Sequence, residues 1–313
     1  MINIYTTDAN KKLKELKNLQ KECWIDLINP SLEEIKEISN KTNTDLDLLT
    51  KLLDDEELPR IEIGDNATLI VVDTPYVTDT NYKHKYNTDP LGLIINNDGY
   101  FITISPKEQT LFNDFKNNKV REFNIKKRTK FVIQILLKTA SVYQRELKAI
   151  NEYINEKEKT LHKSTNNKRL IELLNVEKTL VYFSTSLKAN DVVLEKLAKG
   201  NVLTMYEDDT DLLEDAMIEN KQAIEMANIY REILTSMTDT YATIISNNLN
   251  DVMKFLAGIT IVFSIPTMVA SFIGMNVPLG KIGTSSLSFI LIIAFSFVLS
   301  IIIAIILKKK NML

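Results

Sequence analysis

Two long apolar runs without a charged residue mark the C-terminal part of the chain. They cover residues 255–275 ("FLAGITIVFSIPTMVASFIGM") and residues 287–307 ("LSFILIIAFSFVLSIIIAIIL"), 21 positions each. About 20 apolar residues in a helix span the hydrocarbon core of a bilayer. A pair of core helices in a soluble protein is the alternative, but the second run is too uniformly apolar to find enough cover. The pattern therefore predicts two transmembrane helices after a long polar N-terminal part.

The lysines around these runs predict their orientation. Three consecutive lysines follow the second run directly, whereas residues 276–286 between the runs contain only Lys281. Lysine-rich flanks tend to stay on the cytoplasmic side of a membrane. We therefore expect an outer loop at residues 276–286 and a basic cytoplasmic tail at residues 308–313. Because two spans return the chain to its starting side, the N-terminal part is expected in the cytoplasm too.

Strand-like runs predict a cytoplasmic α/β domain at residues 1–125. Six runs rich in β-branched and aromatic residues are bounded by Gly, Asn, Asp or Pro, as is typical of strands: "INIYTT", "CWIDLIN", "RIEIG", "ATLIVVDTPYV", "LGLIINN" and "YFITIS". Between them, "NPSLEEIKEIS" predicts a helix with Asn29 as its N-cap and Pro30 in its first turn. "TDLDLLTKLLD" predicts a second short helix. The alternation indicates a mixed sheet covered by helices.

A helical pattern then continues to the membrane. Residues 126–208 place apolar side chains three and four positions apart, with "KSTNNK" as a turn, and predict a helical hairpin. Residues 201–257 contain neither Gly nor Pro. With Asp208 or Asp209 as its cap, a single stalk helix is expected over residues 209–275, about 100 Å long at 1.5 Å per residue. It would enter the membrane without a break.

A stripe of small and polar residues follows one face of this helix into the first span (about residues 253–275). Steps alternating four and three residues from Asp239 give an unbroken 3.5-residue repeat in which every member except Met253 is small or polar. A repeat of this period lets several helices supercoil with the same stripe facing a common axis. The stripe consists of Asp239, Thr243, Ser246, Asn250, Met253, Ala257, Thr260, Ser264, Thr267, Ser271 and Gly274.

This stripe has two interpretations. Small residues at helical spacing line close helix–helix contacts in membranes, so the stripe is consistent with a packing face. Recurrent hydroxyls, and a carboxylate directed at a symmetry axis, instead favour the wall of a cation pore. Two spans cannot enclose a channel, so a pore requires several copies. The sequence therefore favours a homo-oligomeric membrane channel.

The outer end of the stripe is the tripeptide Gly274, Met275 and Asn276. A helix C-terminus presents unpaired carbonyls with partial negative charge. Gly274 lets neighbouring backbones approach, and Asn276 adds an amide oxygen. Several such ends around an axis would form a ring of neutral oxygen dipoles. That ring suits Mg²⁺, which dehydrates reluctantly and is held through its water shell.

Composition narrows the function classes. The chain has 38 basic and 41 acidic residues, a net charge of -3, which does not indicate a nucleic-acid binder. One cysteine and two histidines leave no multi-cysteine metal site and no histidine pair at ligand spacing. No glycine-rich phosphate loop or nucleophile–base pair supports an enzyme, and no organic cofactor is expected. The "DDEE" at residues 54–57 is either a solvated corner or a cation site.

Several motifs are similar to those of one known family. They are "GMN" at the end of the penultimate of two C-terminal spans, "NDVMKFL" and "TMVASFI" before it, and the terminal lysine run. "WIDLINPSLEEI", "DDEELPRIEI" and "DPLGLIINNDGYFITI" extend the similarity over nearly the whole chain. The chain thus resembles the CorA-type divalent-cation channels. The resemblance implies a homopentamer that transports Mg²⁺, and also Co²⁺ and sometimes Ni²⁺, with a cytoplasmic α/β funnel and an outer ring of second spans at residues 287–307.

The resemblance also implies roles for individual residues. It places an outer selectivity ring at Gly274 and Asn276, and polar pore positions at Thr267 and Asn250. It places a hydrophobic constriction at Met253 and Leu256, and an acidic ring at Asp239. A basic collar falls on Lys308, Lys309 and Lys310.

In the same family, intracellular Mg²⁺ binds between protomers and holds the channel closed. The resemblance places this role on Asp215, with Asp208 and Asp211 nearby at the start of the stalk. The partner from a neighbouring subunit is expected to be Asp89 or another acid at a strand end. Alternatively, these acids only favour the positive end of a helix.

The chain departs from the family pattern at Ile273, where an aromatic is common, at Ser264, which is often apolar, and at Pro266, shifted by one. The expected outer loop has no acidic residue. These departures bear on ion preference, and a Zn²⁺, Co²⁺ or Ni²⁺ transporter of the same family is the first alternative, although retention of Met275 favours Mg²⁺. A membrane-anchored oligomeric sensor without transport is an alternative of another class.

Overall fold

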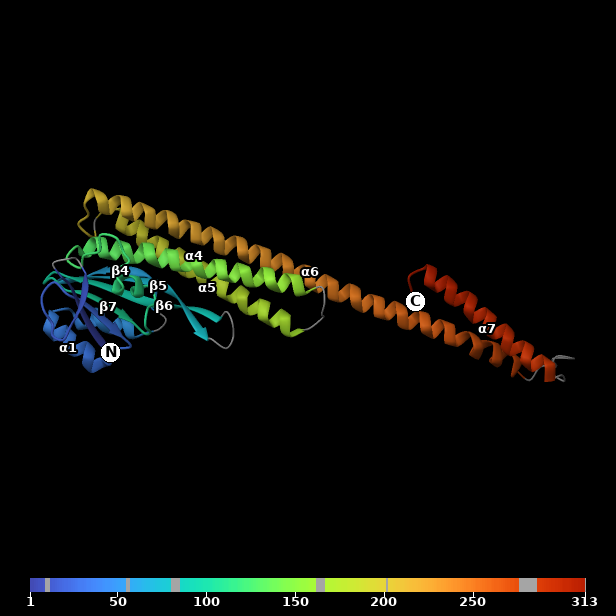
Figure 1. The fold of residues 1–313 in the computed structure, drawn as a ribbon. Coiled ribbons are helices and arrows are strands. Elements are labelled where there is room, and N and C mark those ends of the chain that lie inside the picture. The colour runs from blue at the N-terminus through green and yellow to red at the C-terminus, as the bar shows by residue number, and fades with distance from the viewer. Residues whose placement is uncertain are drawn as a thin grey trace. The chain divides into compact units, whose positions relative to one another are not determined.

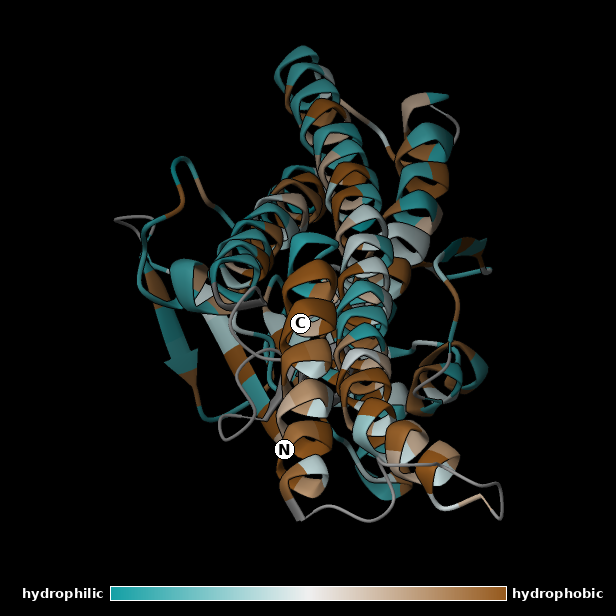
Figure 2. Cartoon of the chain, turned by 90° about the vertical axis from the view of Figure 1, so that its right-hand side faces the viewer, coloured by the Kyte–Doolittle hydropathy of each residue, from teal (hydrophilic) through white to brown (hydrophobic). Residues whose placement is uncertain are grey.

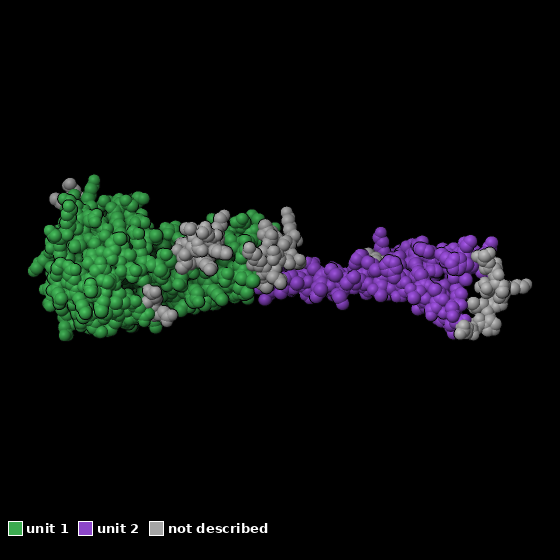
Figure 3. Space-filling view, turned by 90° about the horizontal axis from the view of Figure 1, so that it is seen from below, with its two compact units in different colours: residues 1–237 green, residues 238–313 purple. Residues whose placement is uncertain are grey.

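The computed structural model describes residues 1–8, 12–54, 57–79, 85–161, 167–200, 202–275 and 286–312. The chain divides into two compact units, Met1–Met237 and Thr238–Leu313 (Figure 3). Helix α6 (Glu207–Ile273) contributes to both units.

The first unit contains a mixed sheet, as the sequence predicts, but with seven strands instead of the six that were predicted. The strand order is β2-β1-β3-β7-β6-β5-β4. β3 and β7 run parallel, and the other neighbours are antiparallel. The strands are β1 (Ile2–Thr7), β2 (Leu13–Leu16), β3 (Trp24–Ile28), β4 (Arg60–Ile63), β5 (Ala67–Asp79), β6 (Lys85–Asn96) and β7 (Phe101–Ser105).

Helices cover both faces of this sheet (Figure 1). Trp24 and Val72 face one core, under α3 (Phe112–Lys116), α4 (Arg128–Leu161), α5 (Asn167–Ala198) and the start of α6. Their strand neighbours Ile25 and Val71 face the other core, under α1 (Leu32–Thr42), α2 (Leu46–Thr50) and the 3₁₀ helix η1 (Lys51–Leu53). Successive strand side chains point to opposite faces, so two apolar layers fill both cores.

The N-cap predicted for the first helix is wrong. Ser31, not Asn29, caps α1: its hydroxyl accepts from the Glu34 N–H at 3.2 Å, and the Glu34 carboxylate accepts from the Ser31 N–H at 2.8 Å. This reciprocal pair is a capping box, which satisfies two helix-end donors at once. Asn29 lies two residues earlier in a left-handed turn with φ 43°, a conformation that Asn tolerates well.

Helix α6 also begins earlier than predicted, at Glu207. Asp208 and Asp209 therefore lie inside its first turn rather than before it. The Asp209 carboxylate accepts from the Tyr206 N–H at 3.1 Å, and the Tyr206 carbonyl accepts from the Asp209 N–H at 2.9 Å. Three acids in the first turn suit the positive end of the helix dipole.

The second unit is built from the C-terminal part of α6 and from α7 (Ser286–Lys309). The hydropathy colouring in Figure 2 shows the apolar residues gathered on α7 and on the last turns of α6. These two helices are long and apolar enough to cross a membrane. Only 11% of the apolar window of each is buried within the chain, which argues against the alternative of core helices in a soluble protein.

Candidate functional site

Helix α7 packs along one side of α6 in the second unit. Gly258 and Ile265 of α6 are buried there, together with Ser296 and Ser300 of α7. The Ser300 hydroxyl donates to the Ser296 carbonyl at 3.0 Å, so its polar hydrogen is satisfied within α7. Small residues such as Gly258 allow close approach of helix backbones in a membrane. Neither Gly258 nor Ile265 belongs to the predicted stripe, so the face of α6 that packs on α7 is distinct from the stripe.

The polar stripe lies on the opposite side of α6. Thr260 and Val269 are two and a half turns apart at 3.6 residues per turn, so they point in opposite directions. Val269 lines an apolar groove with Ile292 of α7, whereas Thr260 lines an open hollow with Ser264 and Thr267. All eleven stripe residues from Asp239 to Gly274 are exposed in the single chain. Helix α7 thus leaves the whole stripe uncovered.

Hydroxyls of the stripe bond to their own helix. Thr260, Ser264 and Thr267 donate to carbonyls four residues earlier at 2.8, 2.7 and 3.3 Å, and Thr243 does the same at 3.0 Å. A hydroxyl has one donor and two acceptor lone pairs. Because the donor is used within the helix, the oxygen facing outward acts as an acceptor. Acceptors are what a cation or its water shell requires.

The outer end of the stripe is only partly within the described residues. The Gly274 N–H donates to the Ala270 carbonyl at 2.9 Å and continues the helical pattern. Its φ is not in the left-handed region, and among the described residues an added Cβ would meet only the Ala270 and Ser271 carbonyls, at 3.3 and 3.7 Å. The described part of one chain therefore needs at most a small shift of the Ala270 carbonyl to accept a side chain here. Met275 is 54% exposed, and Asn276 and Lys281 lie outside the described residues.

The residues of the predicted constriction and collar are also solvent-facing in the single chain. Met253 and Leu256 are 60% and 52% exposed. Lys308 and Lys309 form the last turn of α7, where cations suit the negative end of the helix dipole. Lys310 continues this turn, and its N–H donates to the Ile306 carbonyl at 3.2 Å.

The predicted regulatory acids do not meet in one chain. Asp208, Asp211 and Asp215 are exposed on the first turns of α6. Asp89 is buried on β6, and both of its carboxylate oxygens accept from the Lys107 ammonium at 3.1 Å. Among the described residues, no three Asp, Glu, His or Cys side chains converge to hold a metal ion. Any site that uses these acids needs a second subunit or a rearrangement.

Comparisons with known proteins agree with this architecture. The family described as CorA-like Mg²⁺ transporter protein matches residues 20–309. The chain is 28% identical to the cobalt/magnesium transport protein CorA of Methanocaldococcus jannaschii over 291 residues, which cover 92% of this chain and 90% of that protein.

Solved structures show the same fold. The complete CorA magnesium transporter from Methanocaldococcus jannaschii matches with a TM-score of 0.82 and 26% identity, covering 99% of this chain and 96% of that one. The full-length CmaX protein matches with a TM-score of 0.72 at 13% identity, covering 96% and 97%. The second likeness concerns the fold alone. With a family match over nearly its whole length, the chain belongs to the CorA-like Mg²⁺ transporter family of divalent-cation transporters.

Proposed function

We propose that the chain assembles as a homopentameric channel that carries Mg²⁺ into the cell across the cytoplasmic membrane. The observation that carries this proposal is the uncovered polar stripe of α6, opposite the face that α7 covers. A polar face left toward lipid is costly. If several copies assemble with their stripes around one axis, the stripes face water and ions instead of lipid. The pentameric number comes from the family resemblance, and the stripe itself does not count subunits.

In this channel, Gly274, Met275 and Asn276 form the outer selectivity ring. Neutral carbonyl and amide oxygens would hold Mg²⁺ through its water shell and release it again, because charged ligands would bind it too tightly for rapid passage. Among the described residues of one chain, a side chain at position 274 would press only on the Ala270 carbonyl, which supports close approach between copies as the reason for glycine there. Met253 and Leu256 would form the hydrophobic constriction, and Asp239 an acidic ring on the cytoplasmic side.

We place both termini in the cytoplasm. The lysines at the end of α7 would form a basic collar beside the inner mouth, and residues 276–286 would connect the spans outside the cell. This arrangement rests on the positive-inside tendency.

We further propose that intracellular Mg²⁺ closes the channel through Asp215, with Asp211 and Asp208, and an acid of the neighbouring subunit. Mg²⁺ keeps several waters and needs only one or two carboxylates, so exposed acids on two subunits suffice. If Asp89 is that neighbouring acid, it must exchange Lys107 for the ion.

The test is Mg²⁺ influx into liposomes that contain the purified protein and a Mg²⁺-sensitive dye. The wild type is compared with Asn276→Ala and with Asn248→Ala, a matched control on α6 outside the stripe. We expect influx in the wild type and the control, and its loss in Asn276→Ala. The lumen is kept Mg²⁺-free at the start so that the closing sites are empty.

The same assay separates the alternatives. Influx of Zn²⁺, Co²⁺ or Ni²⁺ without Mg²⁺ influx would assign the chain to another ion of the same family. No flux of any divalent ion, with oligomers intact, would favour an oligomeric sensor.

A further inference from the structure

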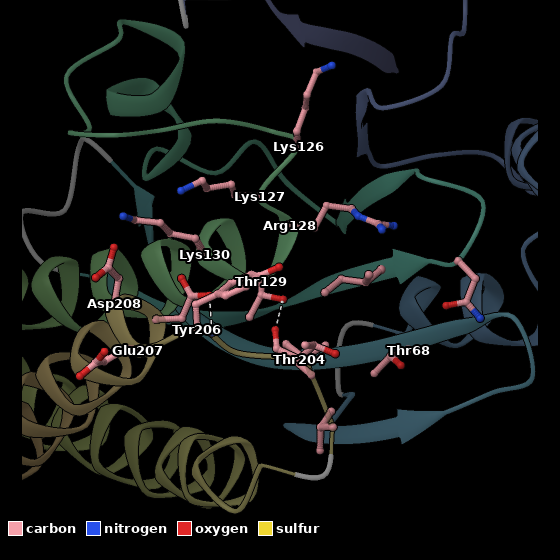
Figure 4. A pocket seen from close by; sticks show the side chains of 15 residues that line it. Thr68, Lys126, Lys127, Arg128, Thr129, Lys130, Thr204, Tyr206, Glu207 and Asp208 are labelled. Atoms are coloured by element: carbon pink, nitrogen blue, oxygen red, sulfur yellow. Dashed lines mark hydrogen bonds between the residues drawn. The ribbon is translucent and has the colours of Figure 1, made fainter.

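A pocket of about 950 Å³ lies in the first unit, between the start of α4, the end of β6 and the start of α6. Figure 4 shows it from close by. Four of the five consecutive residues at positions 126–130 are basic, and all five line the pocket. This basic wall, defined as Lys126, Lys127, Arg128 and Lys130, has no counterpart in the predicted conduction pathway.

The basic wall lies at the N-terminal end of a helix, where cations are unfavourable. Helix α4 begins at Arg128 and has no acidic residue in its first turn. The N-terminal end of a helix carries partial positive charge and is stabilised by anions. Helices α1, α2, α3 and α6 of the same unit do carry acids in their first turns. Basic residues at this position therefore add to the positive potential of the helix end, although Lys126 and Lys130 are each paired with a glutamate.

An acidic wall faces the basic one. Glu207 and Asp208, on the first turn of α6, line the same pocket, and Lys127 and Lys130 extend toward the side on which they lie (Figure 4). The pKa of Lys130 is raised chiefly by its hydrogen bond to Glu122, with a further contribution from Asp208 and Asp209.

The two walls do not neutralise each other directly. Lys126 and Lys130 instead form ion pairs with Glu22 and Glu122 outside the pocket lining, at 2.6 Å each. Within the described part of the chain, none of the ion pairs joins the basic wall to Glu207 or Asp208. Opposite charges thus face a shared space without contact.

We propose that this pocket binds a polyphosphate anion together with its Mg²⁺ ion. Lysine and arginine side chains form strong charge-assisted hydrogen bonds with phosphate oxygens. Mg²⁺ is typically held by one or two carboxylates together with phosphates and waters. Lys127 contacts the phosphates, Lys130 joins it by exchanging Glu122 for a phosphate oxygen, and Asp208 and Glu207 hold the ion. Only a ligand that carries both charges satisfies both walls.

Tyr206 gives the pocket a surface for a base. It lies beside the acidic wall, lines the pocket and is 77% exposed. Exposed aromatic rings stack on nucleobases, whatever the base. A nucleoside polyphosphate and an inorganic polyphosphate share the phosphate chemistry, and the ring distinguishes them. The site lies wholly in the first unit and does not depend on ion conduction.

Equilibrium dialysis of the full-length protein in lipid nanodiscs tests the proposal. Labelled ATP and inorganic triphosphate are each titrated at a constant excess of Mg²⁺, so that Mg²⁺ bound elsewhere on the chain does not change during the titration, and again in EDTA. We expect saturable binding that is at least about tenfold tighter with Mg²⁺ than in EDTA. Binding of both ligands without a magnesium effect would overturn the role of the acidic wall, and no binding of either would overturn the site.

Variants locate the bound ligand. Lys127→Glu should weaken binding by about tenfold or more, since it reverses one phosphate contact, while Lys148→Glu, on an exposed position of α4, should not. Asp208→Asn should weaken binding in Mg²⁺ and leave binding in EDTA unchanged or tighter. Equal binding by Lys127→Glu and Lys148→Glu would overturn the proposal. If Tyr206→Ala weakens the binding of ATP but not of triphosphate, the ligand is a nucleotide. If this variant binds both ligands as tightly as the wild type does, the site recognises the polyphosphate chain alone.

Discussion

The side-chain amide of Asn190 on α5 bonds to both backbone groups of Asp73 on β5. Its nitrogen donates to the Asp73 carbonyl at 2.8 Å, and its oxygen accepts from the Asp73 N–H at 2.9 Å. Strand β4 pairs with β5 only as far as Arg60 opposite Val71, so within the described residues Asp73 has no strand partner on that side. Asn190 replaces the missing strand and ties the helix layer to the sheet.

Asn190→Ala should therefore destabilise the first unit by about 1 to 3 kcal/mol, because two partly buried backbone groups lose their partners. Trp24 is the only tryptophan and is fully buried in the sheet, so its fluorescence reports urea unfolding of this unit. Asn175→Ala, on an exposed position of the same helix, is the control and should change stability little. Equal unfolding midpoints for the two variants would contradict the role of Asn190.

Gly92→Ala tests how tightly η1 packs on the sheet. A Cβ on Gly92 would lie 2.1 Å from Leu52 Cδ1 and 2.8 Å from Leu52 Cδ2, and Leu52 is only 2% exposed. We expect destabilisation of about 1 to 3 kcal/mol from overpacking. In a Leu52→Ala background the same substitution should cost clearly less. The double-mutant cycle measures this coupling, and strictly additive effects would rule out the contact.

The carboxylate of Asp73 makes part of the stability pH-dependent. Burial, and the nearby charge of Asp89, raise its pKa above the usual 3.8, although the Ser186 hydroxyl donates to it and partly offsets the shift. At pH values well below 3.8 the carboxyl group is protonated in both the folded and the unfolded state, and it does not change the free energy of unfolding. As the pH rises from there through the raised pKa, the unfolded chain ionises first and the folded state loses stability.

Asp73→Asn removes this titration and keeps an oxygen for Ser186. The difference in unfolding free energy between Asp73→Asn and the wild type should rise with pH from about 4 and then level off. Urea titrations followed by Trp24 fluorescence at a series of pH values measure it. A difference that stays constant with pH would show that Asp73 does not titrate in this range.

The stripe can be tested by thiol labelling without first removing a native cysteine. Cys23 is fully buried, and burial raises the pKa of its thiol, so it is a poor nucleophile. We expect cysteines introduced at Thr260 and Ser264 to react with a charged, water-soluble thiol reagent. The labelled proteins should then lose Mg²⁺ influx in liposomes. Cysteines at Ile265 and Val269, on the α7 side, should remain unlabelled and active. Equal labelling on both sides of α6 would contradict the assignment of the stripe to an aqueous pore.

Local sequence signals predicted the main elements of the fold. Apolar alternation identified six strands, and the long stretch without Gly or Pro indicated the unbroken helix α6. Strand β2 and helix α3 were missed. The sequence of β2, "LKEL", has two charged residues and no β-branched one, and it becomes a strand through its pairing with β1. The N-cap of α1 was misplaced because Asn29 and Ser31 both suit a cap, and the Glu three residues after Ser31 decides between them.

The stripe was predictable because it lies on a single helix, where spacing alone determines which residues share a face. Its position opposite α7 was not, since that depends on which side of α6 the second span packs. The pocket at the start of α4 was also missed. It combines the basic residues with Ile95, Asn97 and Tyr206, which lie far from them in the sequence and meet only in the folded unit.

The uncovered stripe has a consequence for cells that produce two versions of the chain. If every copy supplies one wall of the same pore, a single defective copy impairs the whole assembly. With equal amounts of wild type and Asn276→Ala mixing at random into pentamers, only about one assembly in 32 contains no variant copy. We therefore expect the defect to be dominant, with Mg²⁺ uptake falling far below half when both forms are co-expressed.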